Sequence, residues 1–197
     1  MDKKLAEQLS FLLEADKMKA ILRQTLVSDG TRRENDAEHS WHLALCAMTL
    51  SEYAAHAAEL NVLRVLKMAL VHDLIEIYAG DTFAFDEAAG LDKEKRESEA
   101  ADRLFAFLPK EQGREYRELW QEFDTMETHD AKFAAAMDRL QPFMLNLATG
   151  GHTWKLGKVN RAKVYRRMAV IEEAVPAIWP YIEEKIEEAV KNGWIAE

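Results

Sequence analysis

The stretch MALVHDLIEIYAGDT, residues 68–82, decides the fold, because it places groups that are costly to bury inside an apolar helix. Its aliphatic residues lie nearly all round the helix, which is typical of a central, buried helix. His72, Asp73 and Glu76 lie among them, and Asp81 follows closely. A buried imidazole or carboxylate costs several kcal/mol unless it is hydrogen-bonded, paired or bound to a metal. The stretch therefore predicts a core helix that carries chemistry.

Two other apolar segments carry the same kinds of group. His39 lies in AEHSWH, and Asp138 lies in FAAAMDRLQP. Together with His72 and Asp73 they form a mixed nitrogen and oxygen set, which suits Mn, Fe, Co, Ni or Zn better than calcium. Neighbouring residues on a helix point about 100° apart, so His72 and Asp73 reach one ion only beyond the end or flank of their helix. Two further helices must then complete the site.

Helical periodicity dominates the remaining sequence and predicts an all-α fold with no convincing strand. At 197 residues the chain is expected to form one domain, residues 1–197. Asn35 and Glu38 fit a capping box, which predicts a helix start near Asp36. A loop of about 14 residues, 79–92, is long enough to be functional. The expected helical segments are 4–26, 36–60, 62–77, 92–107, 109–123, 129–148 and 159–192, the last bent or split by Pro176 and Pro180.

Composition excludes several classes of protein. The formal net charge is −9, which argues against nonspecific nucleic-acid binding, because that depends on Lys and Arg. Any phosphate site must therefore have its own local positive charge. No uncharged apolar run of about 18 residues is present, so no membrane span is expected. The first residues have no secretory pattern, and we expect a cytoplasmic protein whose one cysteine, Cys46, packs as a small apolar side chain.

The segments RRENDAEHSWH, ALVHDLIEIYAGD and MDRLQP resemble the H…HD…D signature of the HD-domain metal-dependent phosphohydrolases. More narrowly, they resemble the branch that contains the bacterial 5'-deoxynucleotidases. The resemblance extends from about Lys19 to Pro142 and implies a compact helical bundle, with C-terminal helices in residues 159–192. It also implies that His39, His72, Asp73 and Asp138 hold one divalent transition metal.

The resemblance assigns roles to further residues. Glu76 and Asp81 match the second carboxylate positions of the family, which handle the attacking water and the leaving hydroxyl. Arg23, in MKAILRQT, resembles the family arginine that grips phosphate. Gln24 stands where the bacterial enzyme has a tryptophan, which leaves the sugar selectivity open.

The predicted function is hydrolysis of (deoxy)nucleoside 5'-monophosphates to nucleoside and phosphate. The chain has no motif for a nucleophilic serine or cysteine and no Gly-rich phosphate loop, which favours direct attack by water. Two alternatives stay open: an HD hydrolase of another phosphate ester, such as an alarmone or a nucleoside triphosphate, and a nucleotide sensor without turnover. The expected partner is a small nucleotide, with no nucleic acid and no membrane. A homodimer is expected, with residues 92–123 as one possible face.

Overall fold

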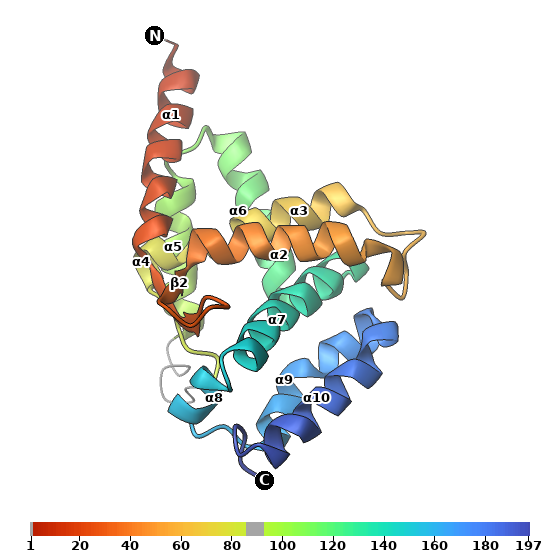
Figure 1. Cartoon of the computed structure of the whole chain (residues 1–197). Helices are drawn as coiled ribbons and strands as arrows, with labels where there is room; N and C mark the ends of the chain where they lie inside the picture. The colour runs from red at the N-terminus through yellow and green to blue at the C-terminus, as the bar shows by residue number, and fades with distance from the viewer. Residues whose placement is uncertain (1, 86–92) are drawn as a thin grey trace.

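The computed structural model of the chain describes residues 2–85 and 93–197. Within them the protein consists of helices and one small two-stranded sheet, which confirms the all-α class (Figure 1). None of these helices combines the length and apolar character that crossing a membrane requires. The elements in chain order are α1 Lys3–Ala15, η1 Asp16–Ala20, β1 Leu22–Leu26, β2 Arg33–Asn35, α2 Asp36–Leu50, η2 Ser51–Tyr53, α3 Val62–Val71, α4 Glu76–Ala79, α5 Lys93–Phe105, α6 Lys110–Thr125, α7 His129–Ala148, α8 His152–Leu156, α9 Arg161–Ala174, η3 Pro176–Ile178 and α10 Trp179–Lys191.

The predicted first helix, residues 4–26, is wrong in its second half. The helix α1 ends at Ala15, and after a 3₁₀ turn the chain becomes extended in β1, which pairs antiparallel with β2. Leu22 lies opposite Asn35, and Leu26 lies opposite Arg33. The strands have five and three residues, too short to leave an alternating apolar pattern in the sequence. Their pairing places β1 beside the start of α2.

The predicted capping box is confirmed at the start of α2. The Asn35 side chain accepts a hydrogen bond from the Glu38 amide (3.0 Å), and the Glu38 carboxylate accepts one from the Asn35 amide (3.2 Å). The helix therefore begins at Asp36, as expected, but it ends at Leu50 rather than near residue 60. His39 thus lies in the first turn of α2.

The predicted helix over residues 62–77 is also interrupted. The helix α3 ends at Val71, and the short helix α4 begins at Glu76, so the HD pair lies in the turn between them. The amide of Glu76 donates to the Asp73 carbonyl at 3.0 Å, a tighter turn than an α-helix makes. Asp73 and Glu76 therefore lie on either side of a bend rather than on one regular helix.

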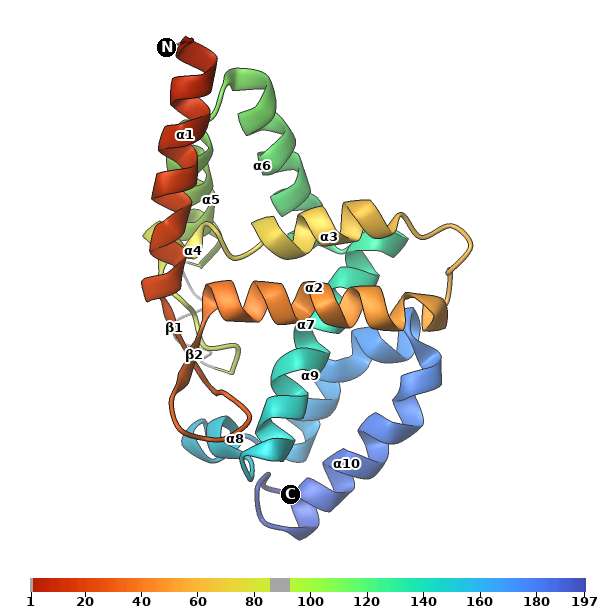
Figure 2. The ribbon, with the colours of Figure 1, turned by 45° about the horizontal axis from the view of Figure 1, so that its top comes forward.

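The long helix α7 lies at the centre of the fold and contacts α2, α3, α6 and α9 (Figure 2). Its buried run Ala134–Ala136 allows the neighbouring helices to approach closely. The predicted division of the last segment is confirmed: α9 ends at Ala174, and a 3₁₀ turn that begins at Pro176 precedes α10. The predicted loop 79–92 is described as far as Phe85, and its remainder lies outside the described residues.

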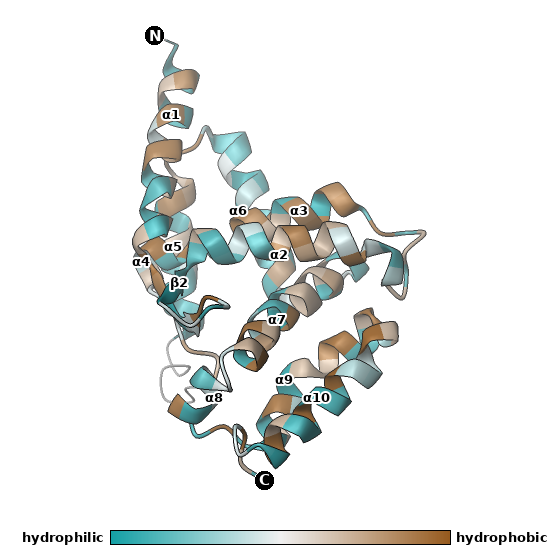
Figure 3. Cartoon of the chain, in the orientation of Figure 1, coloured by the Kyte–Doolittle hydropathy of each residue, from teal (hydrophilic) through white to brown (hydrophobic). Residues whose placement is uncertain are grey.

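Exposed apolar side chains lie mainly on α1, α2 and α3. The ribbon coloured by hydropathy shows apolar residues along these three helices (Figure 3). Examples are Leu13 on α1, Trp41 on α2 and Leu63 on α3, each more than half exposed. In the described residues of α5 and α6, by contrast, no large hydrophobic side chain is exposed. The homodimer stays a prediction, and the exposed apolar surface lies elsewhere than its expected face at 92–123.

Candidate metal centre

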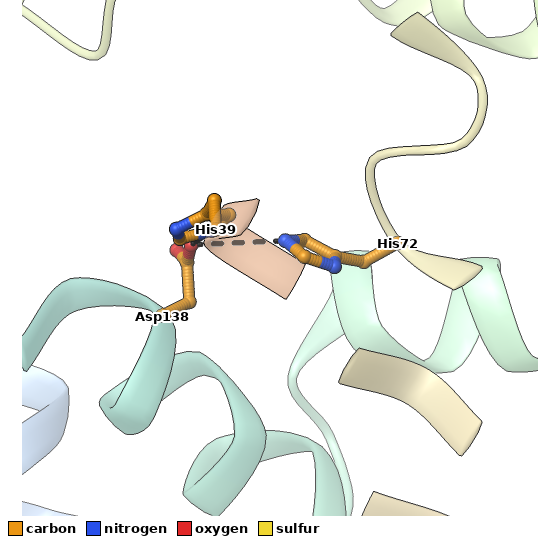
Figure 4. A group of neighbouring side chains, drawn as sticks. All are labelled: His39, His72 and Asp138. Carbon is orange, nitrogen blue, oxygen red and sulfur yellow. Dashed lines mark hydrogen bonds and ion pairs between the residues drawn. The ribbon is translucent and has the colours of Figure 1, made fainter. Parts of the chain in front are cut away.

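Three helices bring two imidazoles and one carboxylate together, although the residues are far apart in the chain. His39 comes from α2, His72 from the end of α3 and Asp138 from the middle of α7 (Figure 4). Nε2 of His39 lies 3.0 Å from Oδ1 of Asp138, and Nε2 of His72 lies 3.8 Å from the same oxygen. One ligand atom from each residue lies within 4.8 Å of the others.

Asp73 completes the predicted set of four. Its Oδ2 lies 3.1 Å from Nε2 of His72 and 3.6 Å from Nε2 of His39. The end of α3 at Val71 makes this possible, because the turn that follows lets adjacent side chains point to one place. The structure thus brings together all four residues that the sequence proposed as metal ligands.

The contact of His72 with the backbone leaves its Nε2 directed at the carboxylates. Nδ1 of His72 lies 3.0 Å from the carbonyl oxygen of Ala69, which only accepts, so Nδ1 carries a proton. Nε2 is buried and has no hydrogen-bond partner within the described residues, although the Asp73 and Asp138 oxygens are near. With Nδ1 protonated, Nε2 faces these oxygens either with a second proton or with a bound cation between them.

The amide of Gln141 fixes the tautomer of His39 in the same way. Its Nε2 donates to Oε1 of Glu34 at 2.6 Å and lies 3.1 Å from Nδ1 of His42. Its Oε1 therefore faces Nδ1 of His39, at 2.9 Å, and accepts a hydrogen bond from it. Nε2 of His39 is left to face Asp138. Sequence reasoning missed Gln141, although it lies three residues after Asp138, on a neighbouring part of the α7 surface.

The electrostatics of this cluster favour an added positive charge. Burial and the Arg23 charge lower the pKa of His39. Burial alone would lower the pKa of His72, but Asp73 and Asp138 outweigh it and raise the pKa to about 10. Burial would raise the pKa of Asp73 and of Asp138, but the neighbouring histidines outweigh it and hold both below their usual range. The donor set and its charge fit a divalent transition ion.

An acidic cluster adjoins this centre and contains the predicted Arg23. Nη1 of Arg23, on β1, donates to Oδ2 of Asp73 at 2.8 Å and to Oδ1 of Asp36 at 3.2 Å. Oxygens of Asp36, Asp73 and Glu76 lie within 4.8 Å of one another. Sequence reasoning used Asp36 only as a helix start, because nothing in the pattern marked its side chain as fully buried.

Two oxygens of the acidic cluster have no hydrogen-bond partner in residues 2–85 and 93–197. Oδ2 of Asp36 and Oε2 of Glu76 are buried without a hydrogen bond among the described residues. Burial and the Asp73 charge raise the pKa of Glu76 to about 12 and that of Asp36 to about 6. Burial also raises the pKa of Asp81, which follows Gly80. Carboxyl groups with raised pKa values are suited to proton transfer.

Both clusters open into one cavity of about 370 Å³, within the range of small-molecule sites. Glu76 and Asp81 line it, together with the aromatic rings of Phe83 and Trp154. Its remaining walls include two arginines on α7 and α9, which the sequence prediction did not use. The cavity is therefore lined by charged groups and by aromatic rings, an arrangement that can hold an anionic group and a planar ring.

The chain is similar to several known proteins. A family profile described as HD domain matches residues 15–179. Over 134 residues the chain is 31% identical to the human 5'-deoxynucleotidase HDDC2. This match covers 68% of the chain and only 63% of that relative. It is 28% identical to a 5'-deoxynucleotidase from Pectobacterium atrosepticum, over 79% of the chain and 82% of that protein. A solved structure from Magnetospirillum magnetotacticum, described as a predicted metal-dependent phosphohydrolase, matches with a TM-score of 0.93 and 51% identity, over 98% of this chain and 96% of that chain.

Proposed function

The chain belongs to the HD domain family, and on that premise we propose that it is a metal-dependent phosphomonoesterase acting on (deoxy)nucleoside 5'-monophosphates. One observation carries the proposal: Nε2 of two buried imidazoles and one oxygen each of Asp73 and Asp138 converge, with nitrogen–oxygen distances of 3.0 to 3.8 Å, and this donor set suits a divalent transition ion. The names of the human and bacterial relatives support the class of substrate.

His39, His72, Asp73 and Asp138 would hold the ion. A divalent ion bound there supplies positive charge to the substrate phosphate and lowers the pKa of a water. The rest of the reaction depends on the chain's own residues. Gln141 and the Ala69 carbonyl fix the orientation of the two imidazole rings, because each accepts a hydrogen bond from Nδ1 of one histidine.

Arg23 holds the substrate phosphate in this proposal. Its Nη1 is fixed by Asp73 and Asp36, which orients the planar guanidinium and leaves its other terminal N–H groups for phosphate oxygens. The side chain is largely buried, so its contact with an anion is little screened by water. This supplies local positive charge that a chain of net charge −9 needs at a phosphate site.

In the proposed reaction, Glu76 and Asp81 take up and donate the protons of the attacking water and the leaving group. The raised pKa keeps Glu76 protonated at neutral pH, and its carboxylate becomes available as a base only when a positive charge beside it lowers that pKa. We assign to it the orientation and deprotonation of the attacking water. Asp81 lines the same cavity and assists protonation of the leaving 5'-oxygen.

The test is phosphate release from paired ribo- and deoxyribonucleoside 5'-monophosphates after chelation and reloading with Mn, Co, Mg or Zn. We expect release with at least one transition ion, a preference for deoxynucleotides, and none with chelator alone. Nucleotide binding without release under every ion would overturn the proposal and favour the sensor. Release from a triphosphate but from no monophosphate would move the function to another phosphate ester.

A further inference from the structure

Two arginines line the cavity beyond the metal centre, and the proposed reaction does not use them. Arg139 lies on α7 directly after Asp138, and Arg167 lies on α9. Nη1 of Arg139 donates to the backbone oxygen of Arg167 at 3.0 Å, which places the two residues together. Nη2 of Arg167 lies 3.4 Å from Oδ2 of Asp138, a long contact for a charged pair.

Arg139 has no carboxylate partner within 4 Å in the described part of the chain. Its other contact is a hydrogen bond from Nη2 to the sulfur of Met126, at 3.2 Å. A half-buried guanidinium beside another arginine, without a carboxylate of its own, is costly unless an anion joins it. Carboxylates are plentiful in this chain, so the arrangement calls for an explanation.

The phosphate that is hydrolysed does not explain these arginines. Arg23 contacts Oδ2 of Asp73, the oxygen that also faces His72. Arg167 contacts Oδ2 of Asp138, whereas the two histidines face Oδ1 of that residue. The guanidinium of Arg23 is sufficient for one phosphate, since its planar fork binds two oxygens. Among the described residues Arg139 is then left without an anion, and Arg167 has only its long contact with Asp138.

We propose that Arg139 and Arg167 form a second anion subsite, which binds a phosphate group other than the one that is hydrolysed. The inference rests on the proposed function, because it names a substrate class for the same cavity. Preferred substrates are nucleotides that carry two phosphate groups, either as a deoxynucleoside 3',5'-bisphosphate or as a 5'-diphosphate. Both present a dianionic group that guanidinium donors bind with charge-assisted hydrogen bonds. In the bisphosphate, water attacks the 5'-phosphorus, the bond to the 5'-oxygen breaks, and phosphate and the 3'-monophosphate are released. In the diphosphate, water attacks the terminal phosphorus, the anhydride bond breaks, and phosphate and the 5'-monophosphate are released.

The experiment compares kcat/KM for deoxyadenosine 5'-monophosphate, 3',5'-bisphosphate and 5'-diphosphate in the wild type, Arg139→Gln and Arg166→Gln. Arg166 is the matched control, because it is exposed on α9 and its replacement removes the same charge. We expect the wild type to prefer one of the two-phosphate substrates by about 10- to 100-fold, the worth of one or two bonds to a charged group. Which of the two is preferred identifies the source of the second phosphate.

In Arg139→Gln the preference should fall toward one, and in Arg166→Gln it should persist. No preference in the wild type, or an equal fall for all three substrates in Arg139→Gln, would overturn the subsite. Should Arg139→Gln not fold, Arg139→Lys replaces it, with an intermediate preference expected because lysine lacks the planar fork. A wild-type preference in that variant would contradict the proposed geometry.

A binding measurement separates this inference from the proposed function. If the wild type releases no phosphate, the same intact nucleotides are titrated calorimetrically into it with Mn²⁺ present. Tighter binding of a two-phosphate nucleotide by about tenfold or more, lost in Arg139→Gln, would support the subsite while the proposed function fails. Phosphate release without any such discrimination would sink the subsite and leave the proposed function standing.

Discussion

The metal centre and the acidic cluster lie side by side, yet they shift the pKa of a buried carboxyl group in opposite directions. In the metal centre, Asp138 faces two imidazoles whose far nitrogens are held by other groups. In the acidic cluster, Glu76 faces Asp36 and Asp73, and in the described part of the chain one of its oxygens has no hydrogen-bond partner despite the nearby Arg23. Asp73 belongs to both, since it contacts the histidines and Arg23.

The pKa values follow this difference. Burial would raise the pKa of both Asp138 and Glu76, but the histidines lower that of Asp138, whereas Asp73 raises that of Glu76 further, to about 12. The backbone of α7 or α4 does not determine which role a carboxylate has. The charge of the groups that face it does. Holding a cation and handling a proton are thus separated by a change of neighbour over a few ångströms.

Asp138→Ala should give the largest effect. The centre loses the carboxylate that both histidines face, so we expect near-stoichiometric metal to fall to almost none, together with activity and the stabilisation that metal gives to the fold. Metal analysis and thermal unfolding with and without ion measure this. Asp102→Ala, exposed on α5, is the control and should match the wild type. Full metal content in Asp138→Ala would show that metal binding does not need Asp138, and the contrast with Glu76 would fail.

Glu76→Gln should keep metal and nucleotide while kcat falls by roughly 10²–10⁴, the range for acid–base help. The amide fills the same volume but cannot take up the proton. Metal content, nucleotide affinity and kcat are measured together on this variant and on Asp138→Ala. If Glu76→Gln loses metal as well, Glu76 is a ligand. A wild-type kcat would instead make Asp81 the better candidate for the base.

Glu34 gives the smallest effect, on the pH dependence of stability in the metal-free protein. Burial raises its pKa from an ordinary 4.5 to about 7, although Arg23 and Gln141 oppose the shift. The folded state thus binds this proton more tightly than the unfolded state. The free energy of unfolding should fall as pH rises from 4.5 to about 7, by at most about 1.4 kcal/mol per pH unit from this group.

The Glu34→Gln variant tests this slope. Urea unfolding between pH 4.5 and 7.5 should show a shallower loss of stability than the wild type, with part of the slope left because the pKa of Asp36 is also raised. Glu52→Gln, exposed after α2, should keep the wild-type slope. An unchanged slope in Glu34→Gln would show that this carboxylate is not strained by burial.

The sequence was sufficient for the groups that are costly to bury. Four residues stand out because each lies in an apolar segment and their spacing matches a known signature: His39, His72, Asp73 and Asp138. Their convergence in the structure follows from helix packing around α7. The role of each as a ligand stays a prediction.

The sequence was insufficient where a feature depends on distant partners. Gln141 acts through hydrogen bonds to Glu34 and His39, each about 100 residues away in the chain. The short strands exist because β2 returns to β1, and the end of α3 before His72 is a local departure from a pattern that otherwise reads as continuous helix. Periodicity describes one segment at a time and does not contain such contacts.

The contact between His39 and Asp138 joins residues 99 positions apart in the chain. In the unfolded polypeptide these ligands are scattered, so an ion binds the native protein far better than the open one. Proteases that act on opened molecules then find fewer of them while the ion is bound. In the proposed centre, the supply of metal would therefore set how long each molecule survives in the cell, in addition to whether it turns over.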